Sequence, residues 1–243
     1  MALLSIKVDN IAALREMRRF REPDPSQAAV LAELAGADGI TCHLREDRRF
    51  IRDRDVYILK EMVKTKLTLQ MAPADDLVER AVEVKPFMVT LMPFIGDETV
   101  IKNGIDLTNN KDLYTEVAAT IKASGISVGF FIEPDIDAVK EAARAKVDAV
   151  EFNAFKYVAA ETIESAEAEL DRLEQMAHLA NKLNLLPNCS NGLSYKSIRP
   201  LIDLGLFEEF TVGNAVIARA LMVGLDRAVS ELLHLVKSAP IRP

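Results

Sequence analysis

The sequence is poor in the residue types that many reaction mechanisms require. It has three histidines, two cysteines and no tryptophan among its 243 residues. Any mechanism that needs a larger histidine cluster is therefore excluded. The two cysteines, Cys42 and Cys189, are too few for a disulfide framework, which favours a reducing, cytoplasmic location.

Positive charge and long apolar runs are also scarce. Lys and Arg number 30 against 37 Asp and Glu, so the formal net charge is −7. This balance argues against nucleic-acid and anionic-membrane partners, because phosphate surfaces need clustered cations. No apolar run reaches the roughly 18 residues that span a bilayer. The segment Met1–Lys7 lacks the basic region and the cleavage site of a signal peptide.

Short β-branched or apolar runs alternate with longer helical stretches along the chain. The predicted strands are Leu3–Val8, Gly39–Cys42, Leu67–Met71, Phe87–Leu91, Ser127–Ile132, Ala149–Phe152, Leu185–Asn188 and Glu209–Val212. The predicted helices include Asp53–Lys64, Asp75–Val84, Asp112–Ser124, Asp135–Ala145, Ala160–Asn184 and Ala215–Lys237. Several begin with Asp, which can cap a first-turn amide. Eight strand-helix units predict an α/β fold, one (β/α)8 TIM barrel over residues 1–243. A doubly wound open sheet is the alternative.

Polar residues gather on one face of the predicted strands. Side chains two residues apart share a face of a strand. Five strands carry polar residues with this spacing near their carboxyl ends: Ser5, Lys7 and Asp9; Thr41 and His43; Thr68 and Gln70; Glu151 and Asn153; Asn188 and Ser190. In a barrel this face points to the interior and the mouth, so the pattern predicts a polar pocket. The competing interpretation is that polar loops begin at strand ends.

A dense charge run, His43–Asp55, follows the second predicted strand directly. Most charge runs are solvated surface. This one begins at the carboxyl end of a strand, where a barrel has its active site, and arginines there suit phosphate or carboxylate recognition.

The run HLREDRRFI at residues 43–51 closely resembles a motif of the pyridoxine 5′-phosphate synthase family. The resemblance extends to four other segments in the same order: PDP at 23–25, AELAGADGI at 32–40, NGLSY at 191–195 and IARALMVGL at 217–225. It covers nearly the whole chain.

The resemblance implies a TIM barrel with additional helices, assembled as a homo-octamer. Members condense 1-deoxy-D-xylulose 5-phosphate with 3-amino-2-oxopropyl phosphate to form pyridoxine 5′-phosphate, releasing phosphate and water. The partners implied are these small phosphorylated substrates, with no metal and no organic cofactor.

Five side chains match family positions with known roles. By resemblance, Asp9 contacts substrate and Arg18 grips the phosphate of the aminoketone. His43 matches a catalytic histidine, Arg45 matches a ligand-binding arginine, and Glu151 matches a glutamate that stabilises intermediates.

Two loop glycines, Gly192 and Gly213, match positions at which backbone amides approach phosphate. Two catalytic positions depart from the family pattern: Gln70 replaces a general-base glutamate, and Asn191 replaces a proton-donating histidine. Thr99 and Val100 stand where the family has a threonine in the loop after the fourth strand. Gln and Asn keep the approximate size of Glu and His but cannot exchange a proton near neutral pH.

Four ligand-binding positions depart as well. Lys7 and Asn10 replace an asparagine and a histidine near the first strand, Phe50 replaces a histidine that contacts the pentulose phosphate, and Asn214 replaces a histidine after Gly213. Such changes are typical of a remodelled pocket rather than a collapsed one.

Among the positions that differ from the family pattern, Lys7 introduces a reactive amine. We expect it to pair with Asp9 or Glu151 or to contact phosphate, and a Schiff base with a ketose is the alternative. We expect His178 and His234 to be structural residues on helices. Because adjacent strand residues face opposite sides, we expect Cys42 to pack against helices rather than act as a nucleophile.

Three functional hypotheses remain open from the sequence. The first is a working pyridoxine 5′-phosphate synthase with an altered residue set. The second is a divergent enzyme that acts on another phosphorylated molecule, through Lys7. The third is a non-catalytic phosphometabolite binder or regulatory partner of a synthase.

Overall fold

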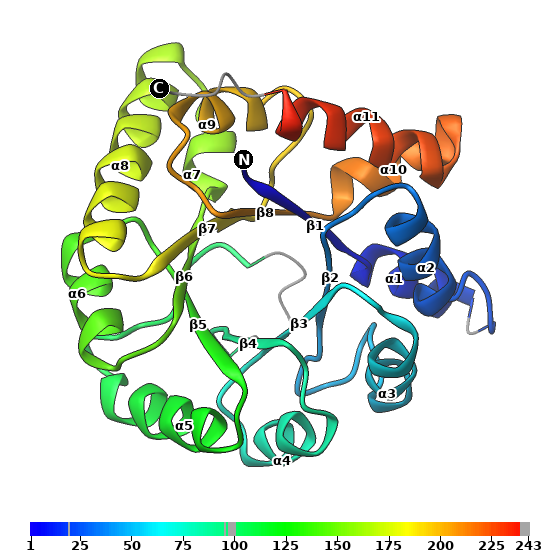
Figure 1. Cartoon of the computed structure of the whole chain (residues 1–243), viewed down its shortest axis with the longest axis horizontal. Coiled ribbons are helices and arrows are strands. Elements are labelled where there is room, and N and C mark those ends of the chain that lie inside the picture. Colours follow the sequence, from blue (N-terminus) through cyan, green and yellow to red (C-terminus); the bar gives the residue numbers. More distant parts are fainter. Residues whose placement is uncertain (19, 95, 97–100, 239–243) are drawn as a thin grey trace.

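Eight parallel strands close into a barrel in sequence order, with β8 paired to β1 (Figure 1). The computed structural model describes residues 1–18, 20–94, 96 and 101–238, without the side chain of Arg18. The strands are β1 (Leu3–Lys7), β2 (Gly39–His43), β3 (Lys66–Met71), β4 (Met88–Leu91), β5 (Ser127–Ile132), β6 (Ala149–Asn153), β7 (Leu186–Ser190) and β8 (Glu209–Val212). The TIM barrel is therefore confirmed and the open sheet is wrong.

Helices surround the barrel on its outside (Figure 1). They are α1 (Asp9–Arg18), α2 (Pro25–Leu34), α3 (Asp53–Met62), α4 (Asp75–Val84), α5 (Lys111–Ala123), α6 (Ile136–Arg144), α7 (Phe155–Val158), α8 (Ile163–Lys182), α9 (Ile198–Leu204), α10 (Asn214–Val223) and α11 (Leu225–Lys237). Pairs of helices follow β1, β6 and β8, so the additional helices are also confirmed. None of the helices in the described ranges is both long and apolar enough to cross a bilayer.

Asp residues start several helices, but not all in the way that the sequence predicts. Asp135 is a true N-cap, accepting hydrogen bonds from the amides of Asp137 and Ala138. Asp53 and Asp75 instead occupy the first helical position, where the negative carboxylate is attracted to the positive end of the helix dipole. The acidic starts therefore stabilise these helices by two different interactions.

One predicted helix is in fact a pair of helices: the stretch Ala215–Lys237 is broken between α10 and α11 at Gly224, whose φ of 86° lies outside the helical range. The stretch predicted as Ala160–Asn184 is the single helix α8, which begins at Ile163 because Thr162 accepts a hydrogen bond from the amide of Ser165 and caps the helix there. The short helix α7 lies before this stretch and was not predicted. Periodicity alone missed the break at Gly224.

The core lies between the barrel wall and the helices. Leu4, Ile6 and Val8 are each at most 1% exposed and face this layer, as does the fully buried Cys42. The opposite parity faces the interior, where the hydroxyls of Ser5 and Thr41 are 2.7 Å apart. The two-residue period therefore separates an apolar layer from a polar interior, as the sequence predicts.

Candidate functional site

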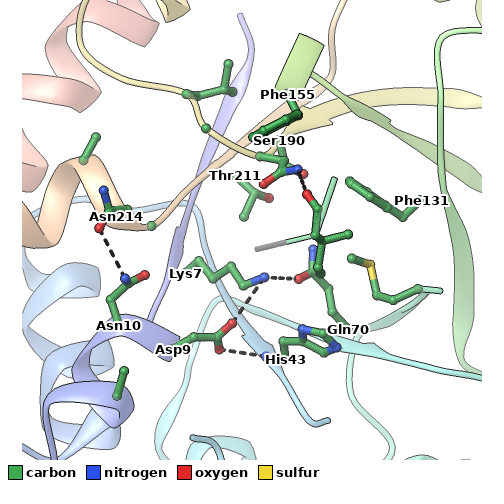
Figure 2. A pocket seen from close by; sticks show the side chains of 18 of the residues that line it. Lys7, Asp9, Asn10, His43, Gln70, Phe131, Phe155, Ser190, Thr211 and Asn214 are labelled. Atoms are coloured by element: carbon green, nitrogen blue, oxygen red, sulfur yellow. Dashed lines mark hydrogen bonds and ion pairs between the residues drawn. The ribbon is translucent and has the colours of Figure 1, made fainter. Parts of the chain in front are cut away.

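A cavity of about 580 Å³ opens at the carboxyl ends of the strands. Its wall includes residues that end β1, β2, β3 and β7 and the segments that follow β6 and β8. That volume lies in the usual range for small-molecule sites. Its lining includes most of the sequence-predicted site residues: Lys7, Asp9, Asn10, His43, Arg45, Phe50, Gln70, Asn191, Gly192, Gly213 and Asn214. Figure 2 shows the side chains of Lys7, His43 and Gln70 converging on this space from three strands.

Lys7, at the end of β1, reaches into the cavity between two polar partners (Figure 2). Its Nζ lies 3.2 Å from Oδ2 of Asp9 and donates to Oε1 of Gln70 at 2.5 Å. The other oxygen of Asp9 accepts a hydrogen bond from the backbone amide of His43 at 2.8 Å. The expected ion pair of Lys7 with Asp9 is therefore present, and it joins the ends of three neighbouring strands.

Gln70 connects this cation to a buried carboxylate. Its Nε2 donates to Oε1 of Glu151 at 2.7 Å, while its Oε1 accepts from Lys7. Gln70 is 1% exposed and Glu151 is 4% exposed. A glutamate at position 70 would instead put two carboxylates in contact, so the amide suits a site that holds both Lys7 and Glu151. Glu151 contacts Gln70 and is not itself part of the cavity wall.

His43 is neutral in this environment. Its side chain is 6% exposed, and burial lowers its pKa well below the ordinary value, with the charges of Lys7 and Arg45 acting in the same direction. Its Nε2 is buried and has no hydrogen-bond partner in the described part of the chain. Because buried polar atoms rarely lack a partner, this nitrogen is suited to bond a ligand in the cavity.

Asn153, at the end of β6, and Asn191, directly after β7, form a second polar group. Nδ2 of Asn191 donates to Oδ1 of Asn153 at 2.8 Å and to the carbonyl of Ile101 at 2.7 Å. Nδ2 of Asn153 donates to Glu133 at 2.7 Å and to the carbonyl of Lys102 at 2.9 Å. Asn191 and Asn153 therefore bind the backbone at Ile101 and Lys102. The amide of Asn191 makes these hydrogen bonds without transferring a proton.

Arg45 and Phe50 come from the loop between β2 and α3. Arg45 is 4% exposed, and its guanidinium contacts Asp47 at 3.0 Å and the carbonyl of Gly96 at 2.9 Å. The pair with Arg45 lowers the pKa of Asp47. Phe50 is half-buried in the cavity wall, with its backbone carbonyl bonded to the guanidinium of Arg15 at 2.9 Å. The charge run is thus partly folded inward rather than wholly solvated.

Two helix N-termini meet at the cavity. Asn10, in the first turn of α1, donates to Asn214, which begins α10, at 3.3 Å (Figure 2). Gly213 precedes α10, and a Cβ built on it would come within 3.1 Å of Cβ of Lys7. The N-terminus of a helix presents unpaired amides and a positive dipole end, which favour an anion. The region from β7 to α10 therefore has the features of a TIM-barrel phosphate site.

Some predicted residues are not brought to the cavity or lie outside the described residues. The side chain of Arg18, and Thr99 and Val100, are in this second group. His178 and His234 are exposed on α8 and α11, as expected of residues on helix surfaces. Burial raises the pKa of Cys42 well above the ordinary value, so this thiol stays protonated and packs behind the barrel wall.

The sequence interpretation missed several residues of the site. Phe131, Phe155 and Thr211 line the cavity, and Glu133 anchors Asn153. Thr211 lies on β8 two residues before Gly213, so the two-residue period contained a signal for it. In the described part of the chain, no three His, Cys, Asp or Glu residues lie together as metal ligands would.

Known proteins match this chain over nearly its whole length. The family model for the pyridoxal phosphate biosynthesis protein PdxJ matches residues 4–238. Pyridoxine 5′-phosphate synthase of Geotalea uraniireducens (strain Rf4) is 43% identical over 239 residues, which cover 98% of this chain and 100% of that protein. The synthase of Syntrophotalea carbinolica is 44% identical with the same coverage. The structure of phosphoribosylanthranilate isomerase from Thermotoga maritima aligns with a TM-score of 0.59 and 15% identity, over 98% of this chain and 99% of that one, which supports the fold alone.

Proposed function

Because this chain belongs to the PdxJ family of pyridoxal phosphate biosynthesis proteins, we propose that it catalyses pyridoxine 5′-phosphate formation in this cavity. The substrates are 1-deoxy-D-xylulose 5-phosphate and 3-amino-2-oxopropyl phosphate. The observation that carries the proposal is the convergence of His43, Arg45, Gln70 and Asn191 on one cavity, with Glu151 bonded to Gln70.

The proposal assigns the phosphates to the cationic and helix-terminal parts of the wall. One phosphate binds at the N-terminus of α10 and the loop at Asn191–Gly192, with Asn10 and Asn214 beside it. The other is held by cationic side chains, including Arg45 and Arg18. Lys7 and Asp9 lie between these regions, where they contact the reacting carbon atoms of a bound ketone.

Proton transfer in the proposed reaction falls to few groups. Gln70 and Asn191 donate and accept hydrogen bonds but do not titrate near neutral pH. Neutral His43, with its unpaired Nε2, accepts and returns protons from bound intermediates. The carboxylate of Glu151 stabilises the positive charge that develops when an amine condenses with a ketone.

A direct assay of the purified protein with both substrates tests the proposal. We expect pyridoxine 5′-phosphate above background, and a loss of roughly 10²–10⁴-fold in rate for His43→Asn, which removes the acid-base group. The matched control is His178→Asn, the same change on an exposed helix surface, which should keep the wild-type rate. No product from the wild-type protein rejects the proposal, and an active His43→Asn variant rejects the role of His43.

A double variant tests whether the cavity still accepts the family's substrates. Gln70→Glu with Asn191→His restores the two proton-transfer groups that the family carries. If the ordinary substrates bind, synthase activity should rise in the folded variant. If activity does not rise although the variant is folded, the cavity is built for a different ligand.

We further propose a homo-oligomer, in the cytoplasm, where the unpaired and buried Cys42 and Cys189 stay reduced. Large apolar side chains lie exposed near the ends of the neighbouring helices α1 and α10: Met17 at 79%, Leu221 at 68% and Met222 at 79%. Such a patch supports burial against a second copy of the chain. Sedimentation should give a mass that is a multiple of the chain's, and Leu221→Asp with Met222→Asp should lower it. A monomer at micromolar concentration contradicts the assembly.

A further inference from the structure

Among the residues that the structure describes, Lys7 is the only lysine in the wall of the cavity. The phosphate sites and the proton transfers proposed above leave the nucleophilic amine of Lys7 unused. Its side chain is 22% exposed, in contrast to the enclosed Gln70 and Glu151. The described residues account for two contacts of its Nζ, with Asp9 and Gln70. An ammonium group has three donors, so the nitrogen keeps one for a ligand atom in the cavity that Lys7 lines (Figure 2).

The neighbours of Lys7 suit an amine that must lose and regain a proton. Oδ2 of Asp9 lies 3.2 Å from Nζ, and Oδ1 of Asp9 is held by the amide of His43, so the carboxylate is fixed in place. Burial raises the pKa of Asp9, and the ammonium of Lys7 offsets this only in part. Asp9 therefore accepts a proton more readily than an exposed carboxylate would. Gln70 fixes the direction of Nζ without competing for its proton.

The position of Lys7 also suits a phosphorylated ketone. Its Cβ lies close to Gly213, directly before the N-terminus of α10. A ketone whose phosphate binds at that helix terminus would reach Nζ with its carbonyl group over the mouth of the barrel. A lysine amine beside a bound carbonyl, with a neighbouring group that can take its proton, is the arrangement that a Schiff base requires.

We propose that Lys7 forms a covalent imine with the ketone group of a phosphorylated ketone bound in the cavity, with Asp9 as the proton acceptor and donor for that step. This inference rests on the proposed function for its ligand, because it takes 1-deoxy-D-xylulose 5-phosphate as the ketone.

The step balances without any further reactant. Asp9 takes a proton from the Lys7 ammonium, and the freed electron pair of Nζ attacks the carbonyl carbon. The carbonyl oxygen receives the electron pair of the broken π bond and takes the proton back from Asp9, which forms a carbinolamine. One of the two protons on the carbinolamine nitrogen then passes to the hydroxyl group, which leaves as water, and the electron pair freed on the nitrogen forms the C=N bond. Overall, one ammonium and one ketone give one iminium and one water.

Reductive trapping tests the inference. The protein is incubated with 1-deoxy-D-xylulose 5-phosphate and sodium cyanoborohydride, and the intact mass and the modified peptide are determined by mass spectrometry. We expect one adduct per chain on Lys7, with a mass equal to that of the ketone less one oxygen atom. Lys7→Arg keeps the charge beside Asp9 but cannot form an imine, so it should give no adduct. Lys66→Arg, at the opposite end of the barrel interior, is the matched control and should give the full adduct.

Thermal stability with the same ketone separates this inference from the proposed function. A thermal shift without an adduct overturns the imine and leaves ligand binding intact, because a bound ligand stabilises the native state. Neither a shift nor an adduct overturns both. An adduct on Lys7 without product in the two-substrate assay supports the imine and overturns ring closure. An adduct that persists in Lys7→Arg lies on another lysine and overturns the imine.

Discussion

At the scale of single residues, the site depends on which side chains can hold a charge at neutral pH. His43 is buried beside Lys7 and Arg45, and each of these conditions disfavours an imidazolium. Gln70 and Asn191 supply hydrogen bonds without charge. The site therefore relies on a neutral histidine and on two fixed carboxylates, Asp9 and Glu151.

His43 should remain neutral throughout the pH range 6 to 8. The reason is its lowered pKa, caused first by burial and then by the charges of Lys7 and Arg45. The test is the ¹H–¹³C NMR signal of its imidazole Cε1–H, assigned by its loss in His43→Asn. We expect no titration of this signal above pH 6, and Lys7→Met should raise the pKa because it removes a positive charge. A midpoint near the ordinary 6.5 would contradict the assignment.

Gly192 cannot be replaced without strain. Its φ is +87°, and a Cβ built on it would lie 2.5 Å from Cγ2 of Val158. We expect Gly192→Ala to lower the free energy of unfolding by about 1–3 kcal/mol, as is usual for a strained backbone. Urea unfolding measures this, with the double variant Gly192→Ala, Val158→Ala as the comparison. In that variant the loss in free energy of unfolding caused by the clash with Val158 should disappear, while the loss caused by the positive φ should remain. If Gly192→Ala leaves the free energy of unfolding unchanged, the loop rearranges freely.

At the scale of elements, one buried ion pair joins α1, α3 and the loop that carries Arg45 and Phe50. The guanidinium of Arg15 bonds both oxygens of Asp55 at 2.8 and 2.7 Å and also bonds the carbonyl of Phe50. Asp55 in turn accepts from the amide of Arg52 and caps α3. The pair therefore fixes both the start of a helix and one side of the cavity.

Removing one partner of this pair should be costly. Arg15→Met leaves the carboxylate of Asp55, which is 5% exposed, without its charge partner. We expect a loss of about 3–5 kcal/mol in the free energy of unfolding. Arg199→Met, which breaks the exposed pair with Asp203 on α9, should cost less than about 1 kcal/mol. Denaturant unfolding of both variants checks this, and similar losses for the two changes would refute the importance of burial.

At the scale of the whole molecule, the barrel interior contains charge at both ends. Glu209 begins β8, at the end opposite the cavity, and is 9% exposed. Burial first, and the charge of Glu151 second, raise the pKa of Glu209 to about 7 from an ordinary 4.5, with Asp38 and Glu208 adding to this and Lys66 opposing it. Glu209 should therefore contribute a pH-dependent part of the stability of the barrel.

The sign of the dependence follows from proton binding. Between pH 4.5 and about 7 the folded chain keeps a proton on Glu209 that the unfolded chain loses, so stability falls as the pH rises through this range. Glu209→Gln removes this effect. Above pH 7 the variant should gain up to about 3 kcal/mol relative to wild type, and below pH 4.5 it should gain none of this. Urea midpoints at pH 5 and pH 8 measure the difference, and an equal gain at both values would contradict it.

Local patterns in the sequence were sufficient for the fold and for the polar strand-end residues of the cavity wall. Alternation of strands and helices depends on neighbouring residues, and the two-residue period assigns Lys7, His43 and Gln70 to the interior without any knowledge of tertiary contacts. The ring of strands then brings their carboxyl ends together, so the predicted polar pocket is confirmed. The helix break at Gly224 was harder, because both of its flanks are strongly helical.

Contacts across the barrel interior were decided by the tertiary structure alone. Lys7 on β1 meets Gln70 on β3, and Gln70 meets Glu151 on β6, although none of these strands are neighbours. The stagger of the strands and the reach of each side chain determine which of the inward residues touch, and neither can be derived from residue order. The sequence therefore determined which groups face the interior, while closure of the sheet decided that an amide would lie between Lys7 and Glu151.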